Sequence, residues 1–180
     1  MQRFMYRTVC TATVGVLVLP LAIACAQELK GETKLPDVVK KTFEAKFPKA
    51  KIEKLDVEVE EGVEVYDIEF RDGKTEKETD ITADGTMLEY TLVIRPKDVP
   101  TAAMKPIRKA AEGATMGRTE KIEVSYELKD GKAIKLPKPV MRYAVEMKKG
   151  DKSAEIIVDA QGKIVEAPKW VAPQEEKSAS

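Results

Sequence analysis

The strongest constraint on the fold is an internal match between two parts of the chain. Residues 66–89 align with residues 143–166 without a gap, at a constant offset of 77, and seven of the 24 positions are identical. The identical pairs are Tyr66 and Tyr143, Glu69 and Glu146, Gly73 and Gly150, Glu78 and Glu155, Ala83 and Ala160, Gly85 and Gly162, and Glu89 and Glu166. Self-similarity at a fixed spacing indicates a duplicated structural unit. We therefore expect the same local structure twice.

A helical pattern precedes the strands of each copy. The apolar residues of these patterns are Leu35, Val39, Phe43 and Phe47 in the first copy and Val99, Ala103, Ile107 and Ala111 in the second, at an offset of 64. A spacing of four residues is typical of a helix with one buried face. Pro106 interrupts the second pattern, so we expect that helix to be kinked or to start late.

The matched segments themselves alternate between apolar and polar residues. Tyr66, Ile68 and Phe70 lie on one side of such a pattern, and the dipeptide Asp72-Gly73 after them is typical of a hairpin turn. The stretch "DITADGTMLE" could be a calcium loop or a strand, a turn and a strand. A calcium loop beginning at Asp80 needs Glu at its twelfth position, where this chain has Thr91, so we favour the turn.

These patterns predict an α+β fold made of two tandem helix-plus-antiparallel-sheet repeats, with the helices packed on one sheet face. The first repeat is expected over residues 35–95 and the second over 96–170. Residues 27–34 are expected to form a flexible leader. Residues 171–180 are expected to form a disordered tail, and "KDGKAIKLPKP" is expected to be a loop of the second repeat.

Residues 1–26 have the composition of an export signal. Two arginines precede the apolar run "VCTATVGVLVLPLAI", and Ala24 and Ala26 supply the small residues of a cleavage site. Cleavage after Ala26 would release a periplasmic or secreted protein. Alternatively, "AIAC" is similar to a bacterial lipobox, which would make Cys25 the lipidated residue of an anchored lipoprotein. A membrane association is expected only in that second case.

The composition excludes several kinds of chemistry. The chain has no histidine, and its two cysteines, Cys10 and Cys25, lie in the predicted signal. Typical zinc sites and Cys/His or Ser/His catalytic pairs are therefore excluded. Without Arg3 and Arg7 the chain has 29 basic and 31 acidic residues, which does not favour a nucleic-acid partner. We expect no cofactor, no bound metal and no catalytic residue.

The order of motifs resembles the PepSY-like family. These motifs are a helix that starts with "LP", a terminal "FP", and then the strand segments "YDIEF", "RDGK" and "DITADGTMLE". The doubled arrangement is similar to the β-lactamase-inhibitor-like branch of that family. The resemblance covers about residues 35–166 and implies an exported module with helices on one face of an antiparallel sheet. It also implies a fold shared with a protein that inhibits an enzyme through its sheet face, and it transfers no catalytic residue.

The sheet face opposite the helices is the candidate partner-binding surface. Its predicted residues are Val65, Asp67, Glu69, Asp80, Arg142, Glu146 and Ile157. Val65 and Ile157 are apolar although this face is expected to be exposed to solvent. Scattered exposed apolar residues are, however, also common on ordinary protein surfaces. We expect a non-catalytic protein-binding module of the cell envelope that acts as an inhibitor or accessory partner of an exported enzyme, with another envelope or secreted protein as its partner. The alternatives are an enzyme that uses carboxylates alone and a small-ligand sensor.

Overall fold

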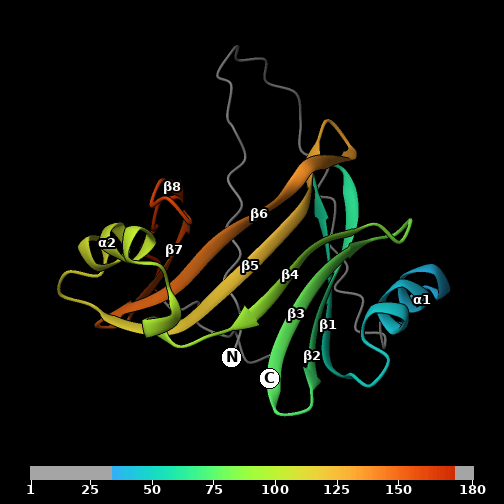
Figure 1. Cartoon of the computed structure of the whole chain (residues 1–180), viewed down its shortest axis with the longest axis horizontal. Coiled ribbons are helices and arrows are strands. Elements are labelled where there is room, and N and C mark those ends of the chain that lie inside the picture. The colour runs from blue at the N-terminus through green and yellow to red at the C-terminus, as the bar shows by residue number, and fades with distance from the viewer. Residues whose placement is uncertain (1–33, 173–180) are drawn as a thin grey trace, which may run out of the picture. The chain divides into compact units, whose positions relative to one another are not determined.

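The computed structural model describes residues 34–172, and its main feature is one antiparallel sheet of eight strands (Figure 1). The strands follow one another across the sheet in chain order. They are β1 (Lys51–Glu60), β2 (Val63–Asp72), β3 (Thr75–Thr82), β4 (Met87–Val93), β5 (Thr115–Lys129), β6 (Lys132–Lys149), β7 (Lys152–Asp159) and β8 (Ile164–Glu166). The helices are α1 (Asp37–Lys46), α2 (Thr101–Ala110) and the short 3-10 helix η1 (Pro96–Asp98).

The expected α+β class is wrong, because the fold is mainly β. Strands contain 58% of the described residues and helices 17%. The two halves do not form two separate helix-plus-sheet units either. β4 of the first half pairs with β5 of the second half, from Glu89 opposite Val124 to Val93 opposite Glu120. This pairing satisfies backbone groups that two separate sheets would leave exposed at their edges.

α1 packs on the first half of the sheet through its aromatic face. Val39 and Phe43 are buried, and the N–H of Phe47 ends the helix by donating to the carbonyl oxygen of Phe43 at 2.8 Å. The Phe43 ring meets Phe70 of β2 edge-on, with ring centroids 4.9 Å apart, and Phe47 lies 4.5 Å from the same ring. The predicted buried face of the first helix is therefore confirmed.

α2 packs on the second half and continues through its internal proline. It begins at Thr101, at the offset of 64 from Asp37, so it does not start late. Ala103, Met104 and Ile107 are buried in a cluster with apolar residues of β6 and β7. Since Pro106 has no N–H, it cannot donate the α-helical hydrogen bond to the carbonyl oxygen of Ala102.

The strands of the two halves have the same register at the offset of 77. Tyr66 of β2 faces Ile81 of β3, and Tyr143 of β6 faces Val158 of β7. Residues opposite each other on paired strands share a sheet face. Lys121 of β5 faces Leu92 of β4 and Tyr143 of β6, and this register connects the side beneath α1 to the side beneath α2. Both helices therefore cover the same face.

The segment expected as a loop in the second half is part of a long hairpin. β5 turns into β6 at Asp130 and Gly131, and β6 contains both prolines of the segment. The register of β6 with β5 shifts between the pairs Val124–Val140 and Tyr126–Lys135. This shift accommodates Pro137 and Pro139, which have no N–H to donate to the neighbouring strand.

The described region begins at residue 34 and ends at residue 172. The predicted signal, including Cys25, lies outside the described residues, as do residues 173–180. Val171, the first residue of the predicted tail, exchanges two backbone hydrogen bonds of 2.9 Å with Ser153. Within residues 34–172, no helix has the length and apolar character needed to cross a membrane.

Candidate functional site

The sheet face opposite α1 and α2, here called the helix-free face, is organised in rows of side chains that cross the strands. The first row consists of Asp56, Asp67, Asp80, Glu89, Val124 and Val140, from β1 to β6. The second row consists of Lys54, Glu69, Glu78, Thr91, Ile122, Arg142 and Asp159, from β1 to β7. The third row consists of Val93, Glu120, Ala144, Ile157 and Glu166, from β4 to β8. The rows are acidic over β1–β4 and largely apolar over β5–β7.

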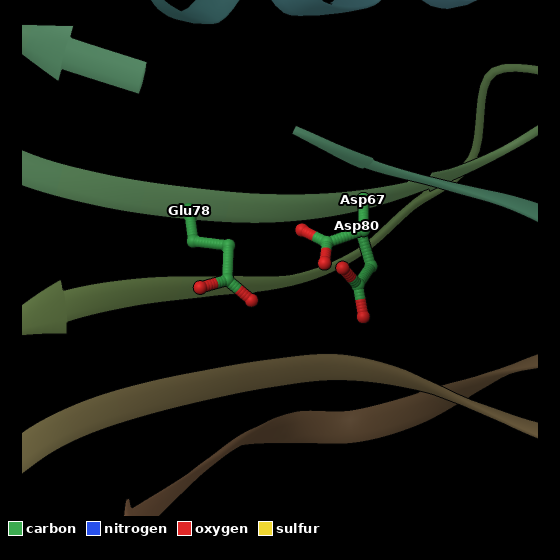
Figure 2. Close-up of side chains that lie close together, drawn as sticks. All are labelled: Asp67, Glu78 and Asp80. Carbon is green, nitrogen blue, oxygen red and sulfur yellow. The ribbon is translucent and has the colours of Figure 1, made fainter. Parts of the chain in front are cut away.

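Three carboxylates come together on the acidic side. Asp67 of β2 and Asp80 of β3 are directly opposite each other, and Glu78 lies beside them (Figure 2). One oxygen from each residue lies within 4.8 Å of the others, and all three residues are buried. Carboxylate oxygens are the ligands that Ca²⁺, Mg²⁺ and Mn²⁺ prefer, so these are the described residues best suited to hold a hard cation.

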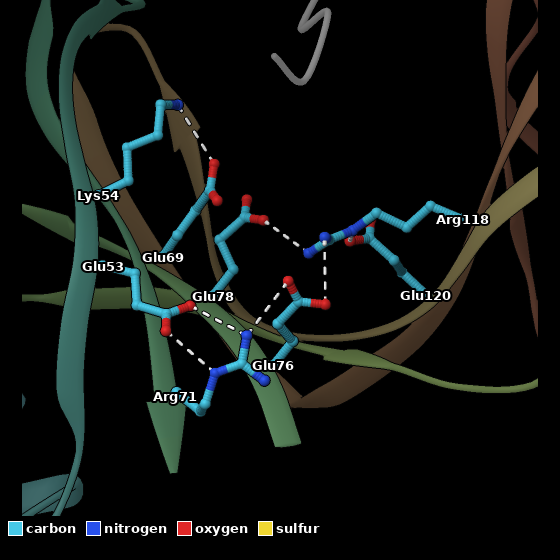
Figure 3. Close-up of polar contacts among 8 residues, drawn as sticks. All are labelled: Glu53, Lys54, Glu69, Arg71, Glu76, Glu78, Arg118 and Glu120. Carbon is cyan, nitrogen blue, oxygen red and sulfur yellow. Dashed lines mark hydrogen bonds and ion pairs between the residues drawn. The ribbon is translucent and has the colours of Figure 1, made fainter. Parts of the chain in front are cut away.

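An ion-pair network borders this cluster (Figure 3). The side chain of Arg118 lies 2.6 Å from Glu120, 3.9 Å from Glu78 and 3.9 Å from Glu76. Glu78 and Glu120 are buried, so the guanidinium of Arg118 offsets part of the cost of removing their charge from water. The network therefore ties the acidic side of the face to β5.

The network continues toward the β1 edge of the sheet. Arg71 lies 3.0 Å from Glu53 and 3.8 Å from Glu76, and Lys54 lies 3.2 Å from Glu69 (Figure 3). Burial alone would lower the pKa of Lys54, but its hydrogen bonds to Asp56 and Glu69 raise that pKa above its usual value. Lys54 therefore stays charged among the acidic residues.

The apolar side of the helix-free face is centred on β5 and β6. Ile122, Val124 and Ala144 form a buried cluster, and Leu136, Val140 and Ile157 pack against it while partly buried. No helix of residues 34–172 contributes a side chain to this cluster. Arg142 lies beside it in the second row and pairs with Glu127.

The structure divides the predicted partner-binding residues into two groups. Val65, Asp67 and Asp80 are buried on β2 and β3 with Glu69 half-buried beside them, and Arg142, Glu146 and Ile157 are half-buried on β6 and β7. β4 and β5 separate the two groups in the sheet. The predicted residues are therefore not adjacent as one patch.

The residues that connect the two groups are not among the predicted partner-binding residues. Glu89 of β4 and Ile122 and Val124 of β5 lie on the same face between the two groups, and Glu78 lies on β3 beside Asp80. The alternation within β5 was visible in the sequence, but its orientation depends on the pairing of β4 with β5. The identity of Glu78 with Glu155 in the internal match was a signal for one of these residues.

Two other features lie away from this face. Tyr66 is buried among the core residues beneath α1, and its hydroxyl donates to Glu64; this bond and burial raise the pKa of Tyr66 to about 12. A groove of about 690 Å³ runs beside α2 toward Gly162. Its charged lining residues are the cations Lys105, Arg108 and Lys109 and one carboxylate, Glu112. The groove does not include the acidic cluster.

Comparison with known proteins identifies the fold. No protein-family model matches the chain, and no curated protein matches it. A candidate periplasmic protein from Bacteroides eggerthii DSM 20697 matches with a TM-score of 0.57 at 12% identity, over 77% of this chain and 91% of that one. A BLIP-like protein from Bacteroides fragilis NCTC 9343 matches with a TM-score of 0.53 at 16% identity, over 81% and 93%.

A third solved structure agrees with these two. A DUF2874 family protein from Bacteroides ovatus ATCC 8483 has a TM-score of 0.56 at 13% identity, over 79% of this chain and 93% of that one. Identities this low establish a shared fold, while membership of the PepSY-like family stays a prediction. The chain therefore has the fold found in a BLIP-like protein and in DUF2874 family proteins.

Proposed function

We propose that this protein is an exported, non-catalytic protein-binding module whose helix-free face docks on another envelope or secreted protein. The observation that carries the proposal is an apolar patch of Leu136, Val140 and Ile157, which are only half-buried and pack against the buried cluster of Ile122, Val124 and Ala144. Neither α1 nor α2 contributes to this cluster, although each helix covers an apolar cluster on the other face. An apolar centre with charged side chains around it has the anatomy of a protein interface.

The comparisons support this proposal through the fold. A BLIP-like protein and a candidate periplasmic protein have the same architecture, which supports an exported inhibitor or accessory partner of an enzyme. The absence of histidine from the sequence supports a role without catalysis. The groove beside α2 has Glu112 as its only lining carboxylate, which gives no support to chemistry by a carboxylate pair.

The proposal can be tested by crosslinking from defined positions in living cells. A photoreactive amino acid is placed at Ile157 or Arg142 on the helix-free face, and at Glu44 on the exposed side of α1 as the matched control. We expect the two face positions to crosslink to the same envelope protein and the Glu44 position to leave that protein uncrosslinked. Products from Glu44 alone, or equal products from all three positions, would reject the helix-free face as the docking surface.

A second step establishes whether the captured protein is a specific partner. The identified protein is purified and its affinity for the Ile157→Asp and Glu44→Lys variants is measured. A charge inserted into an apolar contact should weaken binding by about 2 kcal/mol or more, whereas the Glu44 variant should bind normally. Circular dichroism of both variants checks that the sheet is intact. Equal affinity of both variants would contradict the proposal.

A further inference from the structure

We infer that the partner of the helix-free face presents a cationic surface with apolar side chains beside it. This inference rests on the proposed function, because it assumes that the face docks on a protein. It adds the chemistry of that protein, which follows from how charge is distributed over this chain. The chain has 31 basic and 31 acidic residues, so a strong charge on one face must be balanced elsewhere.

The charges are separated between the two sides of the sheet. Over β1–β4 the first two rows of the helix-free face contain six carboxylates, from Asp56, Asp67, Asp80, Glu89, Glu69 and Glu78, and one ammonium group, from Lys54. The guanidinium of Arg118 on β5 also pairs with Glu78, so the carboxylates still outnumber the cations. The helices on the other side have the opposite bias. α1 contains three lysines and two acidic residues, and α2 contains Lys105, Arg108 and Lys109 with no acidic residue. A neutral chain therefore has one acidic face.

The arrangement of the acidic residues is costly for the sheet. Asp67 faces Asp80, Asp80 faces Glu89, and Glu69 faces Glu78 across adjacent strands. Like charges directly opposite each other destabilise paired strands, because their side chains are only about 5 Å apart. Asp67, Glu78 and Asp80 are buried, whereas Asp56, Glu69 and Glu89 are half-buried, so a cationic surface placed over these last three would offset part of that repulsion on binding. The field of such a face also attracts a basic partner before contact.

The acidic rows are wider than a single metal site. Asp67, Glu78 and Asp80 are close enough to share one ion. The first row, however, continues from Asp56 on β1 to Glu89 on β4, and three steps between strands span about 14 Å. Ligands of one hard cation lie about 2.5 Å from it, so one ion can neutralise only part of this row. Separate lysine or arginine side chains match the half-buried Asp56 and Glu89 at the two ends of the row.

The apolar part of the partner follows from the same rows. Glu89 of β4 faces Val124 of β5 in the first row, and Thr91 faces Ile122 in the second. The acidic and apolar sides therefore meet within one strand spacing, about 5 Å. A partner that fits both must carry its cations next to an apolar patch, so a uniformly basic surface such as that of a nucleic-acid-binding protein fits less well.

Two synthetic peptides of equal length provide the probes. One alternates lysine and valine, and the other alternates glutamate and valine, so they differ only in charge. Fluorescence anisotropy measures their binding to the protein as isolated from the cell envelope. We expect saturable binding of the lysine peptide, weakened about tenfold or more as salt increases, and no binding of the glutamate peptide. Equal binding of both peptides, or binding of neither, would overturn the inference.

Matched variants assign the binding to the face. The face variant combines Asp56→Asn, Glu69→Gln and Glu89→Gln, and the control variant combines Glu44→Gln, Glu112→Gln and Asp151→Asn at exposed positions outside the rows. Both change the net charge by the same amount. The face variant should bind the lysine peptide about tenfold more weakly, and the control should bind it within about twofold. A similar loss in both variants would mean that only the total charge matters and would overturn the inference.

Two further outcomes identify a different occupant of the face. If the protein alone self-associates in sedimentation and the face variant does not, the face binds a second copy. If Ca²⁺ or Mg²⁺ binds at one ion per chain and blocks the lysine peptide, the acidic rows hold a metal. Either result overturns the inference. If crosslinking from Ile157 identifies a partner with a neutral or acidic contact surface, the proposed function stands and only this inference fails.

Discussion

Gly162, in the turn after β7, packs directly on the backbone of α2 at Ala102. A Cβ placed on Gly162 would lie 2.3 Å from the carbonyl oxygen of Ala102, which is closer than any side chain could approach. This is the carbonyl that Pro106 cannot bond, since proline has no N–H. The first half has the same contact in weaker form: a Cβ on Gly85 would lie 2.7 Å from the Cγ1 of Val38.

These two glycines predict different costs for the same substitution. Both have a positive φ, +87° for Gly85 and +86° for Gly162, so alanine strains both backbones by about 1–2 kcal/mol. Gly162→Ala also displaces a backbone carbonyl, whereas Gly85→Ala displaces a side chain that can rotate. We expect Gly162→Ala to lower the free energy of unfolding by about 1–3 kcal/mol more than Gly85→Ala in urea titrations. Equal losses in the free energy of unfolding for the two variants would contradict the close contact between Gly162 and the backbone of α2.

The aromatic core beneath α1 predicts the second result. Phe43 is 2% exposed and its ring contacts both Phe47 and Phe70, so Phe43→Ala should cost about 3–5 kcal/mol. Ile107→Ala, in the aromatic-poor core beneath α2, should cost less. Val38→Ala, at a residue that is 52% exposed, should change the free energy of unfolding by about 0.5 kcal/mol or less and serves as the control. A larger loss for Ile107→Ala would contradict this ranking.

The turn between β3 and β4 predicts a pH dependence. The hydroxyl of Thr82 and the amide of Thr86 donate to Asp84, and these bonds lower the pKa of its carboxyl below the usual value. A lowered pKa means that Asp84 stabilises the fold above its unfolded pKa of about 3.9, and that this contribution disappears as the pH falls through the lower folded value.

Thermal unfolding of Asp84→Asn measures this contribution. We expect the variant to melt below the natural protein at neutral pH, and the difference between the two melting temperatures to shrink as the pH is lowered toward and below about 4. In the equivalent turn between β7 and β8, Gln161 stands at the position of Asp84. The carboxylate of Asp159 accepts hydrogen bonds from the amides of Gln161 and Lys163 there. Gln161→Asn is therefore a suitable control. A difference that is independent of pH would show that the charge of Asp84 has no role.

The predicted export signal has its own test, because it lies outside the described residues. Protein isolated from cells should begin at Gln27 when its N-terminus is sequenced, since cleavage follows the small residues at Ala24 and Ala26. A blocked, lipid-bearing N-terminus at Cys25 would establish the anchored form instead. Protein that retains Met1 in the cytoplasm would contradict both forms.

Much of the local structure could be predicted from the sequence. Hairpin partners are close along the chain, and Gly73 and Gly150 have the positive φ, +64° and +62°, that their turns require. The offset of 77 in the sequence is therefore also the offset in register between the β2–β3 and β6–β7 hairpins. The helices begin and end within a residue or two of their apolar patterns, because Pro36 and Pro100 lie where a helix starts.

The candidate site could be predicted only in part. Asp67 and Asp80 share a face because they belong to one hairpin, whose register is local. Ile122 and Val124 were missed because alternation along β5 says which residues share a face, but not which face that is. That orientation is decided by the pairing of β5 with β4, across a connection that contains η1 and α2.

The sequence by itself determined the β2–β3 and β6–β7 hairpins, the two helices and the absence of histidine from the chain, since each depends on neighbouring residues or on composition. Only the tertiary structure decided that the two halves form one sheet, and with it the fold class. Glu89 and Val124 are far apart in the chain, so no local propensity specifies their pairing. That pairing brings the acidic rows of β1–β4 beside the apolar cluster of β5–β7, and so the charge and chemistry of the helix-free face are properties of the assembled sheet.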